Sequence, residues 1–486
     1  MSRLLAGLRP EHLWKHFADL TQVPRPSEHE GAAMAHIRAW AEARGYEVAG
    51  DPVGNLLVRV PATPGREGAI PTLIQGHVDM VPEQDEGRGI DFTKDPLDVV
   101  LEDGWVRARG TTLGADNGIG VAAGMAVADD PAVSHGPLEL LFTVREETGL
   151  HGASALAIQG IRAKQLLNLD SEELGVLYVG CAGGSQDTIG LTFDRTTTHG
   201  APGGDAALAI SVSGLTGGHS GLEIGTHRAN ALKLLTRVLW GLRSEIPFAL
   251  DSLSGGTAHN AIPKTAAATV VVGRADRERA EELTRALAEE TRREFADHEP
   301  GLSWDVAAAA LPETVLPTRD RDRLLRLLLA LPHGVQEMSR EMPGLVETSV
   351  NLAKVAAAGH GATVTLSCRS SVAEALAALR MKVAAVGELA GGQVTAAAGY
   401  PPWRPNLRSP LLARCKEVWQ RRTGREPAVT AIHAGLECGV LGEKLPGVEM
   451  ISFGPTLLAV HTTKERVEVA SVEAFWGFLV DLLRAA

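Results

Sequence analysis

Residues 71–81, PTLIQGHVDMV, join a short apolar segment to a His-x-Asp pair. The apolar part is bounded by a proline and is typical of a buried strand. His77 and Asp79 are two residues apart, so in an extended chain their side chains point the same way. If His77 binds a metal through one ring nitrogen, the Asp79 carboxylate can orient the ring through the other. The segment therefore predicts a strand that brings a metal ligand to its carboxyl end.

Five more side chains of types that bind metals end similar apolar segments elsewhere in the chain. They are Asp116 in TTLGADNGIG (111–120), Glu146 and Glu147 in LLFTVREETG (140–149), Asp170 in LLNLDSEE (166–173) and His461 in ISFGPTLLAVHTT (451–463). Ligands of open α/β sheets gather beyond the carboxyl ends of the strands. Carboxylates and two histidines at that edge are what a hydrolytic zinc centre needs. The pattern therefore indicates a metallohydrolase.

Single residues in this set have ordinary structural alternatives. His77 could be a surface histidine, Asp116 a helix N-cap and Asp170 a turn carboxylate. The pair Glu146-Glu147 is more informative, because neighbouring carboxylates at a buried strand end repel each other unless a cation lies beside them. One glutamate can then bind the metal while the other accepts a proton from a nearby water. The spacing alone does not distinguish their roles.

The length and composition fit an enzyme of the cytoplasm. At 486 residues the chain is too long for one compact core, so two or more domains are expected. Its net charge of −12 argues against nucleic acid and anionic membranes as partners. Four cysteines without a CxxC pair provide neither a disulfide framework nor a cysteine zinc site. Residues 1–23 resemble an amphipathic helix rather than a signal peptide, and no apolar run reaches the ~18 residues of a membrane span.

Residues 1–186 and 399–486 predict an α/β catalytic domain in two parts. Short apolar segments alternate with segments of helical spacing, which implies a largely parallel mixed sheet flanked by helices. The strand-like segments are NLLVRV (55–60), PTLIQGHV (71–78), LELLFTV (138–144), KQLLNLD (164–170) and GVEMISFG (447–454). The helical segments are residues 28–45, 117–130, 411–424 and 467–486.

The intervening residues 187–398 predict an inserted α+β domain. The segments with strand alternation are ALAISVSGL (207–215), AATVVVGRA (267–275) and ATVTLSCRSS (362–371), and those with long helical spacing are residues 229–245 and 277–298. His461 lies beyond this insert, so the chain must return to the catalytic domain to complete the site. This topology permits the insert to act as a lid over the substrate.

The motifs together resemble those of a known family. They are GHVDMV (76–81), TTLGADNGIG, REETGLHGA (145–153), LLNLDSEE, GGHSG (217–221) and the late His461, in order over nearly the whole chain. This set resembles the dinuclear-zinc aminoacylase/carboxypeptidase-type metallopeptidases, in particular the branch of aminoacyl-histidine dipeptidases, also called cytosolic non-specific dipeptidases or peptidase D. The resemblance implies hydrolysis of unblocked dipeptides, including Xaa-His peptides and the carnosine-like β-alanyl-histidine.

The resemblance also implies a ligand set. His77, Asp116 and Asp170 would hold one Zn²⁺ ion. Asp116, Glu147 and His461 would hold a second, so that Asp116 bridges the two ions. Because these ligands are oxygens and imidazole nitrogens, Co²⁺ or Mn²⁺ could substitute. Asp79 would orient His77, and Glu146 would be the general base for a metal-bridged water.

Further residues would contact the substrate. His219 in GGHSG would assist the oxyanion, and Asn260 and Arg369 would bind the C-terminal carboxylate, for which the planar arginine fork is suited. His259 is a competing candidate for that contact. In IHAGLECG (432–439), Gly435 could add a backbone donor and Glu437 could meet the substrate's amino group.

Other functions are also compatible with the motifs. An N-acyl-amino-acid deacylase or carboxypeptidase on the same scaffold would present an apolar pocket where a dipeptidase needs an acidic group for the free α-amine. A catalytically silent metal-binding interaction protein is disfavoured by the intact Glu146 and the complete ligand set. A homodimer through the inserted domain is compatible with the sequence as well.

Overall fold

The computed structural model describes residue 5 and residues 7–200 and 205–486, and divides into two compact units. Unit 1 comprises Met1–Cys181, Trp403–Ala431 and Leu436–Ala486, and unit 2 comprises Ala182–Pro402 and Ile432–Gly435. Sequence analysis places the domain limits at 186/187 and 398/399 and assigns 432–435 to the catalytic domain. In the division given above, residues 432–435 lie in unit 2, where the backbone N–H of Ala182 donates to the carbonyls of Ile432 (3.0 Å) and Ala434 (3.1 Å). The expected domain limits stay a prediction.

Unit 1 is built on an eight-stranded mixed sheet. In spatial order its strands are β1 (Glu47–Gly50), β2 (Leu56–Val60), β6 (Leu138–Thr143), β3 (Thr72–His77), β7 (Gln165–Asn168), β23 (Glu449–Ser452), β8 (Val176–Cys181) and β22 (Ala428–Ile432). The central strands β6, β3, β7 and β23 are parallel, and β1, β2 and β8 join antiparallel. Every residue of β3 and β6 is buried, which is consistent with their mainly apolar sequences. The expected α/β class is confirmed.

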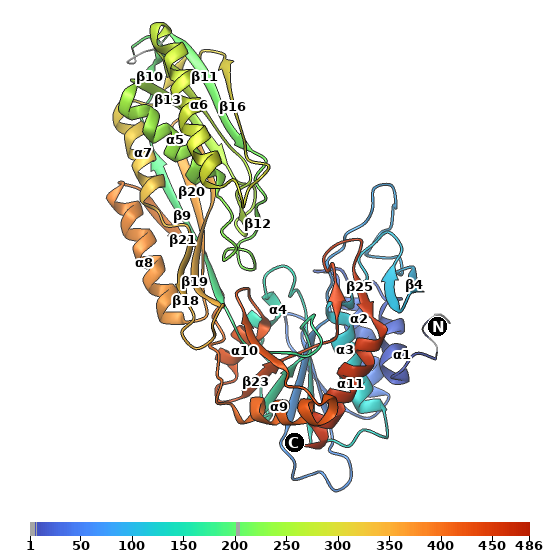
Figure 1. The fold of residues 1–486 in the computed structure, drawn as a ribbon. Coiled ribbons are helices and arrows are strands. Elements are labelled where there is room, and N and C mark those ends of the chain that lie inside the picture. Colours follow the sequence, from blue (N-terminus) through green and yellow to red (C-terminus); the bar gives the residue numbers. More distant parts are fainter. Residues whose placement is uncertain (1–4, 6, 201–204) are drawn as a thin grey trace. The chain divides into compact units, whose positions relative to one another are not determined.

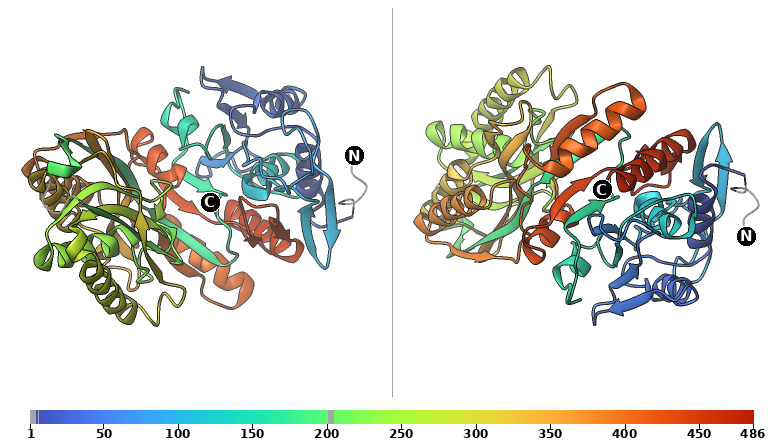
Figure 2. Two further views of the ribbon diagram at one scale, coloured as in Figure 1. Left: turned by 90° about the horizontal axis from the view of Figure 1, so that it is seen from above. Right: turned by 90° about the horizontal axis from the view of Figure 1, so that it is seen from below.

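Helices and a small sheet complete unit 1. The helices are α1 (Glu11–Leu20), α2 (Gly31–Glu42), α3 (Ala115–Asp129), α4 (His151–Ser154), α9 (Pro410–Thr423), α10 (Glu437–Lys444) and α11 (Val469–Arg484). The four-stranded sheet is β24 (Leu457–Leu458), β25 (Arg466–Glu468), β5 (Trp105–Ala108) and β4 (Val99–Glu102). In this sheet β25, from the C-terminal part of the chain, pairs with β5 from the N-terminal part. Figure 2 shows the red C-terminal segment beside blue and cyan N-terminal elements. Of the expected N-terminal helix, residues 1–4 and 6 lie outside the described residues.

Unit 2 is a nine-stranded antiparallel sheet with helices along one face (Figure 1). Its strands are β16 (Ser303–Ala309), β11 (Ala206–Ser213), β15 (Ala266–Val272), β13 (Phe248–Gly255), β19 (Val346–Ala358), β20 (Gly361–Ser370), β9 (Gly183–Thr192) and β21 (Gln393–Ala396), with β18 (Gly334–Met338) beside β19. Two-residue strands pair separately: β10 (Thr196–Thr197) with β17 (Thr314–Val315), and β12 (Gly218–His219) with β14 (Ala261–Ile262).

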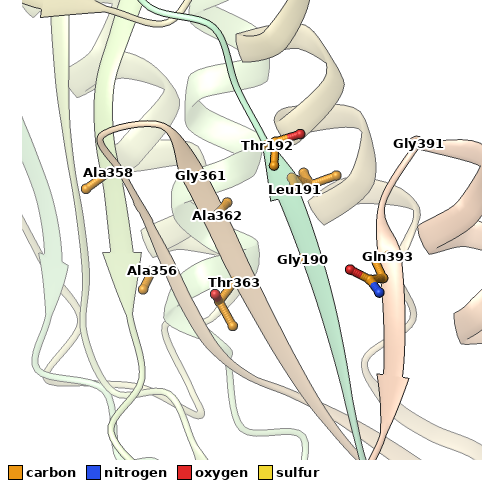
Figure 3. Close-up of a pocket in the computed structure, with 10 residues that line it drawn as sticks. All are labelled: Gly190, Leu191, Thr192, Ala356, Ala358, Gly361, Ala362, Thr363, Gly391 and Gln393. Carbon is orange, nitrogen blue, oxygen red and sulfur yellow. The ribbon is translucent and has the colours of Figure 1, made fainter.

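Four helices cover this sheet where two were expected. They are α5 (Ala231–Glu245), α6 (Arg277–Glu294), α7 (Thr318–Ala330) and α8 (Ala373–Leu389), and all four contribute to one apolar core with the strands. Over β9, β19, β20 and β21 lies a shallow hollow of about 600 Å³ (Figure 3). Its lining side chains, such as Ala356, Thr363 and Gln393, are not titratable, so they offer no acid or base for catalysis.

Among the described residues, no helix is both long enough and apolar enough to cross a membrane.

Candidate metal centre

His77 is the last residue of β3 and is buried, with 1% of its side chain exposed. Its Nδ1 lies 3.0 Å from the main-chain oxygen of Asp79, which can only accept a hydrogen bond. Nδ1 therefore carries a proton, and Nε2 is the ring nitrogen that can bind a metal ion once the ring is neutral. Nε2 lies 3.1 Å from Oδ1 of Asp116 and 3.3 Å from Oδ1 of Asp170. Burial alone would lower the pKa of His77, but the charge of Asp170 and hydrogen bonds with Asp116 and Asp170 raise it well above its ordinary value. Nε2 thus faces two carboxylates that could share a metal ion with it.

His461 faces a second pair of carboxylates in the same way. Its Nε2 lies 3.2 Å from Oδ2 of Asp116 and 2.9 Å from Oε2 of Glu147. Asp116 therefore presents one oxygen to each histidine. In each of two groups, His77-Asp116-Asp170 and Asp116-Glu147-His461, one ligand atom per residue lies within 4.8 Å of the others. A third group, His77-Glu146-Glu147, meets the same distance, so distances alone do not assign Glu146 a role.

Asp79 contacts the backbone of both glutamates as well as the ring of His77. Its Oδ1 lies 3.5 Å from His77 Nδ1, whereas its main-chain oxygen lies closer to that nitrogen, at 3.0 Å. The same carboxylate accepts the backbone N–H groups of Glu146 (3.0 Å) and Glu147 (3.2 Å), and the hydroxyl of Ser27 (2.9 Å). Asp79 therefore orders the backbone of the two glutamates as well as lying beside the histidine ring.

The expectation that all of these side chains follow strands of the parallel sheet is wrong for two of them. His77 ends β3, and the segments of Glu146 and Asp170 follow β6 and β7 directly. Asp116 instead lies in the first turn of α3, after a turn in which Gly114 has φ +66°. His461 lies in a loop after β24, with φ +60°. Asp116 therefore reaches the site through a turn, and His461 reaches it through the loop after β24, a strand of the small four-stranded sheet.

The charges of the site are unbalanced. Burial alone would raise the pKa of Asp116, but hydrogen bonds with His461 and His77 lower it. The same carboxylates, Asp116 and Glu147, raise the pKa of His461 to about 11. Burial, together with neighbouring carboxylates, raises the pKa of Glu146 and of Asp170 well above the ordinary values. Buried carboxylates outnumber the histidines here, so divalent cations fit the site.

Glu437, in the first turn of α10, adds another carboxylate beneath the centre. It is fully buried, and its Oε2 accepts hydrogen bonds from Gln75 Nε2 (2.5 Å) and Thr143 Oγ1 (2.8 Å). Its Oε1 has no hydrogen-bond partner in the protein. Burial raises the pKa of Glu437 to about 7, so near neutral pH this side chain changes charge easily.

The other expected residues belong to unit 2. Nδ1 of His219 accepts the backbone N–H groups of Gly221 and Leu222, each at 3.3 Å, so in the neutral ring the proton sits on Nε2. Burial, and secondarily the charge of Arg369, lowers the pKa of His219 to about 4, which keeps the ring neutral. Asn260 accepts the N–H of Ser220 through its main-chain oxygen at 2.7 Å. Burial also lowers the pKa of nearby His259.

Arg369 has a partner that sequence analysis did not find. The guanidinium is buried, with Nη1 donating to the hydroxyl of Tyr400 at 2.7 Å and Nε without a partner in the protein. A Cβ atom at Gly184 would lie 2.6 Å from the Tyr400 ring, and one at Gly435 would lie 2.8 Å from it. Gly435, expected as a backbone donor, therefore leaves room for this tyrosine.

His433 was also missed. It is 6% exposed, and its Nε2 lies 2.7 Å from Oγ of Ser349, the direct cross-strand partner of Arg369 between β19 and β20. His433 lies in IHAGLECG, next to the residues that sequence analysis considered, but a single histidine there gives no sign of its contact with Ser349. For Tyr400, the glycines that accommodate its ring are a local signal.

Comparison with known proteins identifies the family. The model of peptidase family M20/M25/M40 matches residues 73–485, most of the chain. The chain belongs to this family. The cytosol non-specific dipeptidase of Escherichia coli (strain K12) is 39% identical over 480 residues, which are 99% of this chain and 98% of that protein. The family and branch expected from the motifs are confirmed.

Solved structures agree with this placement. Aminoacylhistidine dipeptidase from Vibrio alginolyticus matches with a TM-score of 0.91 at 37% identity, covering 100% of this chain and 99% of that one. Aminopeptidase PepT from Bacillus cereus matches with a TM-score of 0.56 at 17% identity over 98% of each chain, a likeness of fold alone. A succinyl-diaminopimelate desuccinylase from Cereibacter sphaeroides is 29% identical over 300 residues, covering 58% of this chain and 72% of that protein.

Proposed function

We propose that this protein is a metal-dependent dipeptidase that hydrolyses unblocked dipeptides, including Xaa-His peptides and β-alanyl-histidine. The observation that carries the proposal is the shared carboxylate of Asp116, whose two oxygens face Nε2 of His77 and Nε2 of His461. Such a carboxylate fits two cations that have one ligand in common. The 39% identity to a non-specific dipeptidase over nearly the full length supports the same activity.

The cofactor proposed is two zinc ions per chain, with Co²⁺ or Mn²⁺ as substitutes. One ion would be held by His77, Asp116 and Asp170, and the other by Asp116, Glu147 and His461. Bound cations of this kind polarise a scissile carbonyl and lower the pKa of an attacking water to about 7. The surplus of buried carboxylates supports this assignment, because without cations they repel one another.

The remaining chemistry falls to side chains of the protein. Glu146 accepts the proton of the attacking water and returns it to the leaving amine, for which a buried carboxyl with a raised pKa is suited. His219, neutral with its proton on Nε2, donates a hydrogen bond to the oxyanion of the substrate. Asp79 holds Glu146 through its backbone N–H.

Recognition of the substrate's carboxylate is assigned to Arg369 and Asn260 in unit 2, which we propose acts as a lid. A dipeptide then has both charged ends paired, whereas a tripeptide leaves one charged end unpaired in a desolvated site, at a cost of several kcal/mol. The test is kcat/KM for Ala-His, Ala-His amide and Ala-His-Ala on the wild type and Arg369→Ala. The substitution should lower kcat/KM for Ala-His and change that for the amide little. Equal rates of the wild type on all three substrates would contradict this assignment.

A deacylase or carboxypeptidase on the same scaffold is the alternative. The desuccinylase relative favours it, but that match covers only 58% of this chain, whereas the dipeptidase match covers 99%.

We also propose a cytoplasmic location, from the name of the 39% identical relative. We further propose a homodimer through unit 2, which sedimentation of the purified protein would test.

A further inference from the structure

We propose that Glu465 is a positioning residue that, together with Arg25, fixes the turn before Asp116 against the segments of His77 and His461. The inference rests on the proposed function, because it assumes that these residues bind metal ions. Nothing in the motifs points to Glu465, which follows His461 by four residues in HTTKE (461–465).

Glu465 binds four successive backbone N–H groups. Its Oε2 accepts from Leu113 (2.8 Å) and Gly114 (3.0 Å), and its Oε1 accepts from Ala115 (2.7 Å) and Asp116 (3.3 Å). The residue is only 2% exposed, so water does not compete for these bonds. Four donors fill the acceptor sites that a carboxylate offers. One side chain from the His461 segment therefore holds the whole turn that ends in Asp116.

Arg25 holds the same turn from its carbonyl side. Its Nη2 donates to the carbonyl of Gly114 (2.5 Å), and its Nη1 donates to that of Val78 (2.7 Å), the residue after His77. Gly114 permits this approach: its φ is +66°, and a Cβ there would lie 2.6 Å from Arg25 Nη2 and 2.7 Å from Met80 Sδ. Burial lowers the pKa of Arg25, and the negative charges of Glu465 and Asp79 partly raise it again, to about 10. The guanidinium is therefore charged at neutral pH.

The two side chains together connect three ligand-bearing segments. Arg25 joins the His77 strand to the turn, and Glu465 joins the turn to the His461 loop. Asp116 takes part in both candidate metal groups, so a displacement of this turn would disturb both. The carboxylates of the site repel one another before a cation binds. Contacts that do not involve the cation must therefore keep Asp116 in place, and Glu465 supplies them.

The substitution that isolates this role is Glu465→Gln. An amide has nearly the same volume but one acceptor oxygen, so it can serve only one of the two N–H pairs and turns its own donor toward the other. We expect binding of zinc to weaken by about 10- to 100-fold, as for other residues that orient metal ligands through a second contact. Zinc bound per chain is measured by mass spectrometry across a series of buffered free-zinc concentrations, without substrate.

Glu299→Gln is the matched control. Glu299 is also 2% exposed and accepts two backbone N–H groups, from Thr216 (2.7 Å) and Ala229 (3.0 Å), but it lies in unit 2 and in none of the candidate metal groups. Both variants should lower the melting temperature, and only Glu465→Gln should weaken zinc binding. If Glu465→Gln does not fold, Arg25→Lys, which keeps the charge and loses the two-pronged contact, should weaken zinc binding in the same direction.

The outcomes separate the two proposals. Wild-type protein that binds two zinc ions per chain, with Glu465→Gln or Arg25→Lys unchanged, overturns the positioning role and leaves the proposed function standing. Equal loss of zinc in Glu299→Gln also overturns that role, because the effect would then be general destabilisation. Wild-type protein that binds no divalent cation overturns both.

Discussion

The imidazole Nε2 of His461 lies 2.9 Å from the carboxylate Oε2 of Glu147. Hydrogen bonds to Asp116 and Glu147 raise the pKa of His461 to about 11, so without metal the ring is protonated at pH 7. A histidine must be neutral to bind a metal ion, and zinc binding at pH 7 should therefore release at least one proton per chain. Calorimetric titration with zinc in two buffers of different ionisation enthalpy measures this number. Identical heats in both buffers would mean that His461 loses no proton and binds no metal.

The roles of the paired glutamates can be separated by substitution. Glu146→Ala should keep both zinc ions and lose about 100- to 10,000-fold in kcat, because only the proton transfer is removed. Glu147→Ala should lose activity together with one zinc ion, because its Oε2 contacts His461 in the second group. Metal content and kcat are measured on the same preparations. The reverse pattern, with zinc lost in Glu146→Ala alone, would exchange the two roles.

Tyr400→Phe removes the hydroxyl that accepts the 2.7 Å hydrogen bond from Arg369. A less firmly held guanidinium should bind the dipeptide carboxylate less well, and kcat/KM for Ala-His should fall about 10-fold, corresponding to one hydrogen bond to a charged group. The dipeptide amide, which has no carboxylate, serves as the internal control and should change little. An equal loss on both substrates would show that Tyr400 acts on something other than carboxylate binding.

His433 predicts a pH dependence of stability. Burial, and then the charge of Arg369, lowers its pKa to about 3, so the unfolded state binds a proton more readily than the folded state. This contribution to the free energy of unfolding is constant above pH 6.5 and is lost as the pH falls below it, by about 2 kcal/mol at pH 5. Urea unfolding at pH 7.5 and pH 5 should show a smaller loss for His433→Gln than for the wild type. Equal losses would mean that the folded protein accommodates a protonated ring.

The elements that the sequence predicted well are those with a strong local pattern. Strands β3, β6 and β7 are buried and lie in mainly apolar segments, and α5 and α6 show clear helical spacing. Asp116 and His461 were placed at strand ends because apolar runs precede them. The run before Asp116 forms a turn, and the run before His461 ends in β24 of the small four-stranded sheet. A local sequence pattern does not show which sheet a segment joins.

The side chains that were missed depend on partners far away in the chain. Glu465 contacts residues 113–116, and Tyr400 contacts Arg369. A single glutamate or tyrosine outside a motif carries no signal of such a contact. By contrast, the ligand groups were found because several metal-binding residue types recur in short, ordered motifs.

The central claim is that the protein is a metal-dependent hydrolase of dipeptides with a free amino terminus. The most direct measurement compares kcat/KM for Ala-His with that for N-acetyl-histidine on the zinc-loaded wild type, before and after removal of zinc by a chelator. We expect Ala-His to be preferred by at least about 100-fold, since a site built to pair a free amine rejects a substrate that lacks it. The activity should disappear with the chelator and return with zinc. Cleavage of N-acetyl-histidine at an equal or higher rate, or hydrolysis that does not respond to the chelator, would contradict the account.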